Sequence, residues 1–213
     1  MLMNIDVYVV TDRGLAGGRD LVEIVEESLQ GGAGIIQLRE KEISTRHFLE
    51  LARELKTVVD RYEDRLLIIN DRLDIALAAG AHGVHLGQDD MPLPVAREVL
   101  GTEAIIGVSV STVEEARAAE AAGADYLGAS AVFGTPTKED AAPIGLEGVR
   151  RITAAVDVPV VAIGGIHRDN AGEVIAAGAH GVAVVSEVMT AAEPWQAVKI
   201  LRERVNKAKR GEN

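Results

Sequence analysis

The chain has 213 residues, of which 47% are hydrophobic and 26% charged, a globular composition without an apolar run long enough to cross a bilayer. It contains no cysteine, which excludes disulfides and thiolate metal sites, so any metal must be held by oxygen or imidazole ligands. The formal net charge of −11 argues against nonspecific binding to nucleic acid and restricts anionic ligands to places where basic side chains gather locally.

Short apolar, β-branched runs alternate along the chain with longer segments of helical period. This alternation predicts parallel strands joined by crossover helices. The eight predicted strands span residues 6–11, 34–38, 66–70, 83–86, 104–108, 125–129, 158–163 and 181–185. Eight strands, with no GxGxxG after the first, favour a closed (βα)8 TIM barrel over a doubly wound open sheet. We expect one α/β domain over residues 1–213, with a core from about 5 to 205 and a polar C-terminal tail at 206–213.

The turns that lead from a predicted helix into a strand repeat the dipeptide Gly-Ala at residues 32, 80, 123 and 178. Glycine suits the end of a helix because it adopts a positive φ without steric cost. In a barrel of this class the chemistry lies at the C-terminal ends of the strands, and these turns stabilise the opposite face. His82 and His180 lie in such turns, so we assign both a structural role.

The second predicted strand ends in the run Gln37-Leu38-Arg39-Glu40-Lys41. Alternation along an extended strand places Gln37, Arg39 and Lys41 on one side. An arginine fork and a mobile lysine charge beside an amide suit a phosphate or a diphosphate. A surface ion pair with Glu40 is an equally balanced alternative.

Carboxylates follow the next two predicted strands, with Asp71 after the third and Asp89 and Asp90 after the fourth. Each of them could cap the helix that follows. Capping does not explain why neighbouring strand ends both present carboxylates beside a basic cluster. That arrangement suits Mg²⁺ held by one or two carboxylates and substrate phosphates. His85, just before this loop, is expected to be packed or hydrogen bonded inside the barrel.

The last four strand ends carry hydroxyls and glycines. Ser109 ends the fifth strand without an adjacent base in the sequence, so we expect it to hydrogen bond and not to act as a nucleophile. The sixth strand leads into the longest loop, 131–145, which suits a mobile cover, although a plain flexible loop is the simpler interpretation. Gly164-Gly165 and Val185-Ser186 follow the seventh and eighth strands, the usual phosphate-binding place in this fold.

Seven motifs in this order at the strand ends resemble the motif series of the thiamine-phosphate synthase family. They are Gln37-Leu38-Arg39-Glu40-Lys41, Asn70-Asp71, Gly87-Gln88-Asp89-Asp90, Gly107-Val108-Ser109, Thr135-Pro136-Thr137-Lys138, Gly164-Gly165-Ile166 and Val185-Ser186. The resemblance runs from about Tyr8 to Val205. It implies a transferase that joins a hydroxymethylpyrimidine diphosphate to a thiazole phosphate, giving thiamine phosphate and diphosphate, with Mg²⁺ as cofactor. It implies no nucleic-acid or membrane partner and leaves the oligomeric state open.

The resemblance also implies a role for particular residues. On the pyrimidine diphosphate side it places Gln37, Leu38, Arg39, Glu40, Lys41, Asn70, Ser109 and Lys138, with Asp71 and Asp90 as ligands of Mg²⁺. On the thiazole phosphate side it places Thr135, Pro136, Thr137, Gly165, Val185 and Ser186. Arg39, Lys41, Ser109 and Lys138 would stabilise the departing diphosphate and are the implied catalytic residues. The chain departs from the family pattern at Ala129-Ser130-Ala131 and at Gly134, which bears on the stiffness of the loop.

Two alternatives belong to other functional classes. A thiazole tautomerase of the same barrel family would carry a histidine where Ala131 stands and would lack the paired carboxylates. A noncatalytic sensor of phosphate ligands would not need Asp71, Asp90 and Arg39 together. The N-terminal residues lack the pattern of a secretory signal, so we expect a cytoplasmic protein.

Overall fold

The computed structural model describes residues 3–134 and 143–212. The predicted substrate residues Thr135, Pro136, Thr137 and Lys138 therefore lie outside the described residues. Eight parallel strands follow one another round a closed barrel, and β1 closes it by pairing with β8 as well as with β2. The strands are β1 (Val7–Val10), β2 (Ile35–Leu38), β3 (Leu66–Asn70), β4 (Gly83–Leu86), β5 (Ile105–Val110), β6 (Tyr126–Ala129), β7 (Val160–Ile163) and β8 (Gly181–Val184). The predicted TIM barrel is confirmed.

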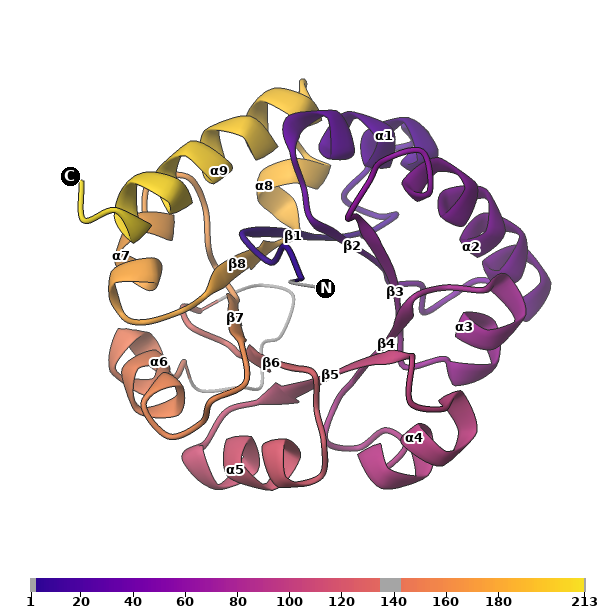
Figure 1. Cartoon of the computed structure of the whole chain (residues 1–213). Coiled ribbons are helices and arrows are strands. Elements are labelled where there is room, and N and C mark those ends of the chain that lie inside the picture. The colour runs from indigo at the N-terminus through magenta and orange to yellow at the C-terminus, as the bar shows by residue number, and fades with distance from the viewer. Residues whose placement is uncertain (1–2, 135–142, 213) are drawn as a thin grey trace.

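A ring of helices surrounds the barrel (Figure 1). The helices are α1 (Leu21–Gly31), α2 (Thr45–Val59), α3 (Leu73–Ala79), α4 (Leu93–Leu100), α5 (Val113–Ala121), α6 (Gly145–Thr153), α7 (Ala171–Ala176), α8 (Ser186–Met189) and α9 (Pro194–Lys209). The short helix α8 follows directly on β8, and α9 completes the ring between α7 and α1. Since α9 continues to Lys209, the segment predicted as a tail begins inside this helix, and the Lys209 ammonium pairs with Asp6 at 2.5 Å. No described helix is long and apolar enough to span a membrane.

Alternation along the strands divides the buried residues into two cores. The outer core lies between strands and helices and includes Leu38, Leu67 and Val84. The inner core fills the barrel and includes Tyr8 and Tyr126. Because side chains of successive strand residues point to opposite faces, residues two apart on one strand share the barrel interior. This rule brings the polar strand-end residues towards the axis of the barrel.

The turns before the even-numbered strands close the N-terminal end of the barrel. His82, Asp125 and His180 occupy the same place in their turns, and each accepts a hydrogen bond from a backbone N–H of the preceding strand, at 2.9, 2.7 and 3.1 Å. Gly34 takes this place before β2, where a Cβ would lie 1.9 Å from the backbone oxygen of Asn4. The structural role predicted for the two histidines agrees with these contacts.

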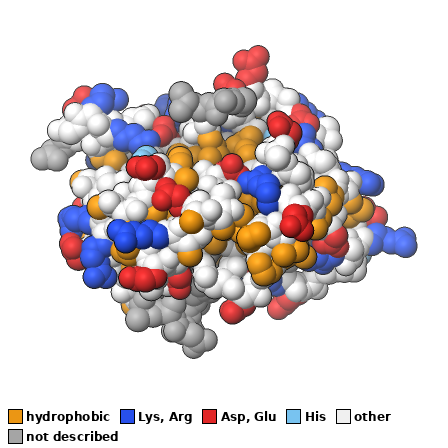
Figure 2. All heavy atoms as spheres, turned by 60° about the horizontal axis from the view of Figure 1, so that its bottom comes forward, with side chains coloured by type: hydrophobic (Ala, Val, Ile, Leu, Met, Phe, Trp, Pro, Cys, Tyr) orange, Lys and Arg blue, Asp and Glu red, His pale blue; other side chains and the backbone are white. Residues whose placement is uncertain are grey.

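The outer surface mixes charges of both signs. On the face in Figure 2 the basic side chains are scattered among acidic ones around a group of apolar residues. At the C-terminal strand ends two basic side chains, Arg39 and Lys41, line one pocket together with carboxylates.

Candidate active site

Two adjoining pockets open at the C-terminal end of the barrel. The first, which we call the polar pocket, has a volume of about 390 Å³, and its lining includes Arg39, Lys41, Asn70, Asp71, His85, Asp90 and Ser109. The second, the barrel pocket, has a volume of about 250 Å³, and its lining includes Tyr8, Asp12, Gln37, Ala131, Gly165, Val185 and Ser186. Arg39, Asn70, His85, Ser109 and Ser130 line both. These shared residues make the two pockets adjacent, so molecules bound in them would lie side by side.

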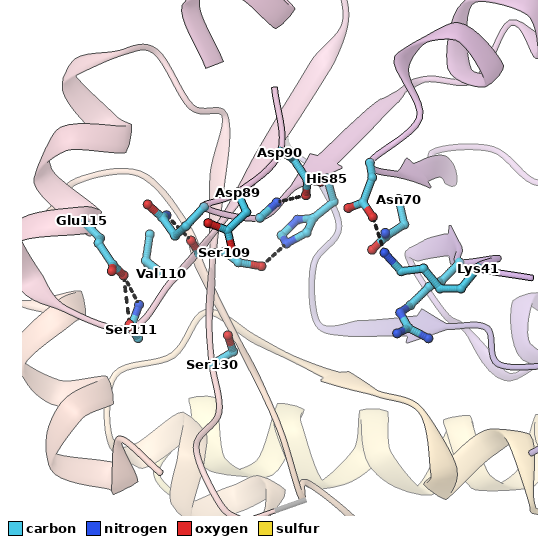
Figure 3. A pocket seen from close by; sticks show the side chains of 14 residues that line it. Lys41, Asn70, His85, Asp89, Asp90, Ser109, Val110, Ser111, Glu115 and Ser130 are labelled. Atoms are coloured by element: carbon cyan, nitrogen blue, oxygen red, sulfur yellow. Dashed lines mark hydrogen bonds and ion pairs between the residues drawn. The ribbon is translucent and has the colours of Figure 1, made fainter. Parts of the chain in front are cut away.

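The polar pocket gathers side chains from the ends of β2, β3, β4 and β5. Figure 3 shows Lys41, Asn70, His85 and Asp90 around one space. The Lys41 ammonium pairs with Asp71 at 2.5 Å, and the Arg39 guanidinium lies 3.7 Å from the carboxylate of Asp12. Each cation is thus held by a carboxylate on a neighbouring strand end. Since Lys41 is exposed, it is free to move from Asp71 to an anionic ligand.

Helix capping does not account for Asp71 or Asp90. The N-cap residue of α3 is Arg72 and that of α4 is Pro92, and neither helix has a side-chain capping bond. Asp71 instead has a positive φ of 60°, a conformation that is uncommon outside glycine. Asp90 accepts a hydrogen bond from the backbone N–H of Gly87 at 2.6 Å, which ties its carboxyl to its own loop. The conformation of each loop therefore determines the position of its carboxylate.

The two carboxyl groups lie close enough to affect each other electrostatically. Burial, followed by the neighbouring carboxyl of Asp71, raises the pKa of Asp90 above its ordinary value. A cation between two such carboxylates would relieve their repulsion. The residues therefore fit a hard divalent ion with oxygen ligands. In the described part of the chain no group of three or more His, Asp or Glu side chains is arranged for a metal, so phosphate and water oxygens would have to complete the shell.

Ser109 has a spatial neighbour that its sequence position did not reveal. His85 Nε2 lies 2.8 Å from Ser109 Oγ, and the other ring nitrogen of His85 lies 3.0 Å from the hydroxyl of Tyr126. The backbone carbonyl of Ser109 accepts a further hydrogen bond from Gln88 at 2.6 Å. His85 is therefore hydrogen bonded inside the barrel, as expected, but it is in direct contact with a predicted substrate residue.

The barrel pocket brings together the described residues predicted for the thiazole phosphate. Gly165 and the preceding Gly164 both have positive φ, at 62° and 110°, so the β7 loop turns in a way that favours glycine. A Cβ on Gly164 would lie 2.8 Å from the Cβ of Ala131. Val185 and Ser186 line the pocket from the end of β8 and the start of α8. Backbone groups can thus approach a ligand closely here.

Among the predicted substrate residues that the structure describes, two line neither pocket. Leu38 is fully buried in the outer core, on the face of β2 that is turned towards the helices. The side chain of Glu40 is only 4% exposed, and its carboxylate pairs at 2.8 Å with Arg13, not with Lys41. Of the run 37–41, the alternate residues Gln37, Arg39 and Lys41 reach the pockets, as the strand alternation predicts.

Comparison with known proteins agrees with the arrangement of these strand ends. Residues 7–188 match the family model described as thiamine monophosphate synthase. The thiamine-phosphate synthase of Moorella thermoacetica is 54% identical over 205 residues, which cover 96% of this chain and 97% of the relative. That of Clostridium novyi is 50% identical over 190 residues, which cover 89% and 93%. The chain belongs to the thiamine monophosphate synthase family.

A solved structure extends the likeness to three dimensions. Thiamine phosphate pyrophosphorylase from Pyrococcus furiosus superposes with a TM-score of 0.90 at 47% identity, covering 97% of this chain and 98% of that one. As a member of the thiamine monophosphate synthase family, the chain keeps Ala131 in the wall of the barrel pocket, where the tautomerase alternative requires a histidine.

Some residues of this family member's site were missed by sequence reasoning. Asp12 lies two residues after the end of β1, so the rule that strand ends carry the chemistry would have found it. Gln88 lines the polar pocket beside the predicted Asp90, but the sequence analysis gave it no role of its own. Tyr126 begins β6 inside the barrel, and no local signal distinguishes it from a core tyrosine.

Proposed function

We propose that the chain is a thiamine-phosphate synthase, a transferase that joins a hydroxymethylpyrimidine diphosphate to a thiazole phosphate. The observation that carries this function is the pair of adjoining pockets with a shared wall. The polar pocket combines paired carboxylates with Arg39 and Lys41, which suits a diphosphate with its metal. The barrel pocket combines apolar walls with the glycine turn at Gly164-Gly165, which suits a ring that carries a phosphate.

The reaction needs no protein nucleophile. The bond between the pyrimidine methylene carbon and the diphosphate oxygen breaks, and its electron pair leaves with the diphosphate. The positive charge that remains is delocalised over the aminopyrimidine. The lone pair of the thiazole nitrogen then forms the new C–N bond, giving thiamine phosphate. Catalysis of such a step consists of stabilising the leaving anion and aligning the two rings.

In this proposal Arg39 and Lys41 stabilise the leaving diphosphate. Arg39 lines both pockets and can address either phosphate group, whereas Lys41 lines only the polar pocket. Asp71 and Asp90 would hold Mg²⁺, which when bound would withdraw charge from the diphosphate. We assign Asn70 and Ser109 to hydrogen bonds with the pyrimidine diphosphate because both lie in the shared wall. The predicted roles of Thr135, Thr137 and Lys138 remain part of this proposal.

The test is incubation of the purified chain with both substrates, with and without added Mg²⁺. Thiamine phosphate and diphosphate should form in equal amounts, and only when both substrates and Mg²⁺ are present. An Asp71→Asn, Asp90→Asn double variant with unchanged thermal unfolding is the matched control for a contaminating activity. Isomerisation of the thiazole without coupling would instead identify a tautomerase, and binding without turnover would identify a sensor.

A further inference from the structure

Five polar side chains form a continuous hydrogen-bonded chain through the interior of the barrel. Gln37 Nε2 donates to the hydroxyl of Tyr8 at 2.6 Å, and the hydroxyls of Tyr8 and Tyr126 are 2.8 Å apart. Tyr126 then contacts His85 Nδ1 at 3.0 Å, and His85 Nε2 contacts Ser109 Oγ at 2.8 Å. This series of hydrogen bonds begins at Gln37 on β2 and ends at Ser109 on β5, so it joins two predicted substrate residues.

Two glycines make room for this arrangement. His85, Gly107 and Tyr126 are register partners on β4, β5 and β6, so the glycine lies between the two rings. A Cβ on Gly107 would lie 2.1 Å from Tyr126 Cζ, and a Cβ on Gly128 would lie 2.9 Å from His85 Cε1. With these spaces open, the His85 and Tyr126 ring centroids approach to 5.5 Å. The contact therefore depends on the identity of residues on three strands.

The number of hydrogens available in this series of side chains determines which group donates in each hydrogen bond. A tyrosine hydroxyl has one hydrogen to donate. Gln37 donates to Tyr8, so among the hydrogen-bond partners of Tyr8 in the described residues only the Tyr126 oxygen can accept the Tyr8 hydrogen. With Tyr8 donating to Tyr126, the Tyr126 hydrogen is directed to His85 Nδ1. A neutral imidazole that accepts at Nδ1 carries its proton on Nε2 and donates there. The Ser109 oxygen is then an acceptor from His85, and its own hydrogen points away from the ring.

Both tyrosines retain their protons in this environment. Burial raises the pKa of Tyr8 and of Tyr126 well above the ordinary value, so neither hydroxyl ionises near neutral pH. Each is almost wholly inaccessible to solvent, at 2% and 0% exposure, and bulk water does not compete for the hydrogen bonds. The direction established at Gln37 is therefore transmitted to Ser109.

We propose that Tyr126 is a positioning residue that holds His85 as the Nε2–H tautomer, so that Ser109 offers its hydrogen to an acceptor atom of the pyrimidine diphosphate. Ser109 cannot then pass its proton to His85, and it acts as a directed donor and not as a nucleophile. The kinetic part of this inference rests on the proposed function, whereas the tautomer itself does not.

An opposite orientation of the Gln37 amide would reverse every step. The Gln37 oxygen would accept from Tyr8, His85 would carry its proton on Nδ1, and Ser109 would donate to His85. Ser109 would then present only acceptor positions to a ligand, and His85 would be placed as its base. The tautomer of His85 alone distinguishes the two directions.

The first test is the nitrogen NMR spectrum of the full chain with ¹⁵N-labelled histidine, assigned to His85 by comparison with a His85→Gln variant. The expected result near neutral pH is a protonated Nε2 and an unprotonated Nδ1. A protonated Nδ1 in the wild-type chain would overturn the proposal. This measurement needs no substrate, so it remains decisive even if the chain does not make thiamine phosphate.

The second test compares Tyr126→Phe with Tyr8→Phe, each checked for folding by circular dichroism. Tyr126→Phe should give a mixture of His85 tautomers and lower kcat about two- to tenfold, the effect of one lost hydrogen bond. Tyr8→Phe keeps the Tyr126 hydroxyl but removes its link to Gln37, so it should also give a mixture of His85 tautomers, and it should lower kcat no more than Tyr126→Phe does. A folded Tyr126→Phe variant with the wild-type tautomer and rate would contradict the proposal. If this variant does not fold, the wild-type spectrum still decides it.

Discussion

The two ends of the barrel use similar residue types for opposite purposes. At the N-terminal end, His82, Asp125 and His180 each accept a backbone hydrogen bond from the neighbouring strand. At the C-terminal end, Asp71 and Asp90 face one another, and their proximity contributes to a raised pKa at Asp90. The carboxylate and imidazoles of the first end are satisfied by the fold. The carboxylates of the second end are placed at an energetic cost that a bound cation would remove.

This contrast assigns different tasks to the two ends of the barrel. Each N-terminal turn ties its strand to the one before it, so that end maintains the register of the sheet. The C-terminal loops are anchored on these strands and can hold a residue such as Asp71 at a positive φ. We therefore expect substitutions at the two ends to separate stability from activity.

The largest effect is expected at the carboxylate pair. Asp71→Asn and Asp90→Asn should each lower Mg²⁺-supported coupling about 100-fold or more, because an anionic ligand of the proposed metal is lost. Thermal unfolding without ligands should be unchanged or slightly raised, since the repulsion between the carboxylates is relieved. Initial rates across a Mg²⁺ titration test this. Normal turnover at low Mg²⁺ in both variants would show that the pair does not act on a metal.

A stability effect is expected at the opposite end. Asp125→Ala removes the acceptor for the Ile106 N–H and the partner of Arg97, which lies 2.7 Å away. The free energy of unfolding should fall by about 1–3 kcal/mol, the cost of an unsatisfied polar group, while kcat of the folded fraction is retained. Asp125→Asn keeps an acceptor and should lose less. Urea unfolding with a parallel assay measures both, and a fall in kcat without loss of stability would break the contrast.

Within the active end, Ser109→Ala should have a modest effect. One neutral hydrogen bond contributes about 0.5–1.5 kcal/mol, which corresponds to a roughly two- to thirteenfold fall in the chemical rate. Single-turnover measurement of diphosphate release separates this from product release. Complete loss of chemistry in a folded variant, or a covalent Ser109 adduct, would instead identify a nucleophile.

The smallest effect is expected from the pH dependence of the two turn histidines. Burial lowers the pKa of both His82 and His180 below the ordinary value of 6.5, and nearby lysines contribute in the same direction. As the pH falls through 6.5 the unfolded chain takes up protons before the folded chain does, so stability is lost until the folded pKa values are reached.

The measurement is the unfolding free energy between pH 7.5 and pH 5, with a His82→Asn, His180→Asn double variant as control. Asparagine retains an acceptor near the position of Nδ1 but does not titrate. The decline of stability towards low pH should be shallower in the double variant than in the wild type. Equal slopes would mean that other groups control acid stability.

Much of the site was predictable because strand ends are local features of the sequence. Apolar β-branched runs show where strands lie, and alternation within the run 37–41 correctly separates Gln37, Arg39 and Lys41 from Leu38. The likeness of the turns at His82 and His180 also predicts their structural role. Each of these inferences depends only on residues within a few positions of one another.

Other features required the closed barrel. Nothing near Asp71 in the sequence excludes a role as helix cap, and that role is excluded only because α3 begins after Arg72 without a side-chain cap. Likewise, Ser109 is 24 residues from His85, and Tyr8 is 118 residues from Tyr126. Their contacts follow from the register of the parallel strands and from the pairing of β1 with β8. Periodicity along the chain specifies which face a side chain occupies, but only closure of the sheet determines which side chains meet across the barrel.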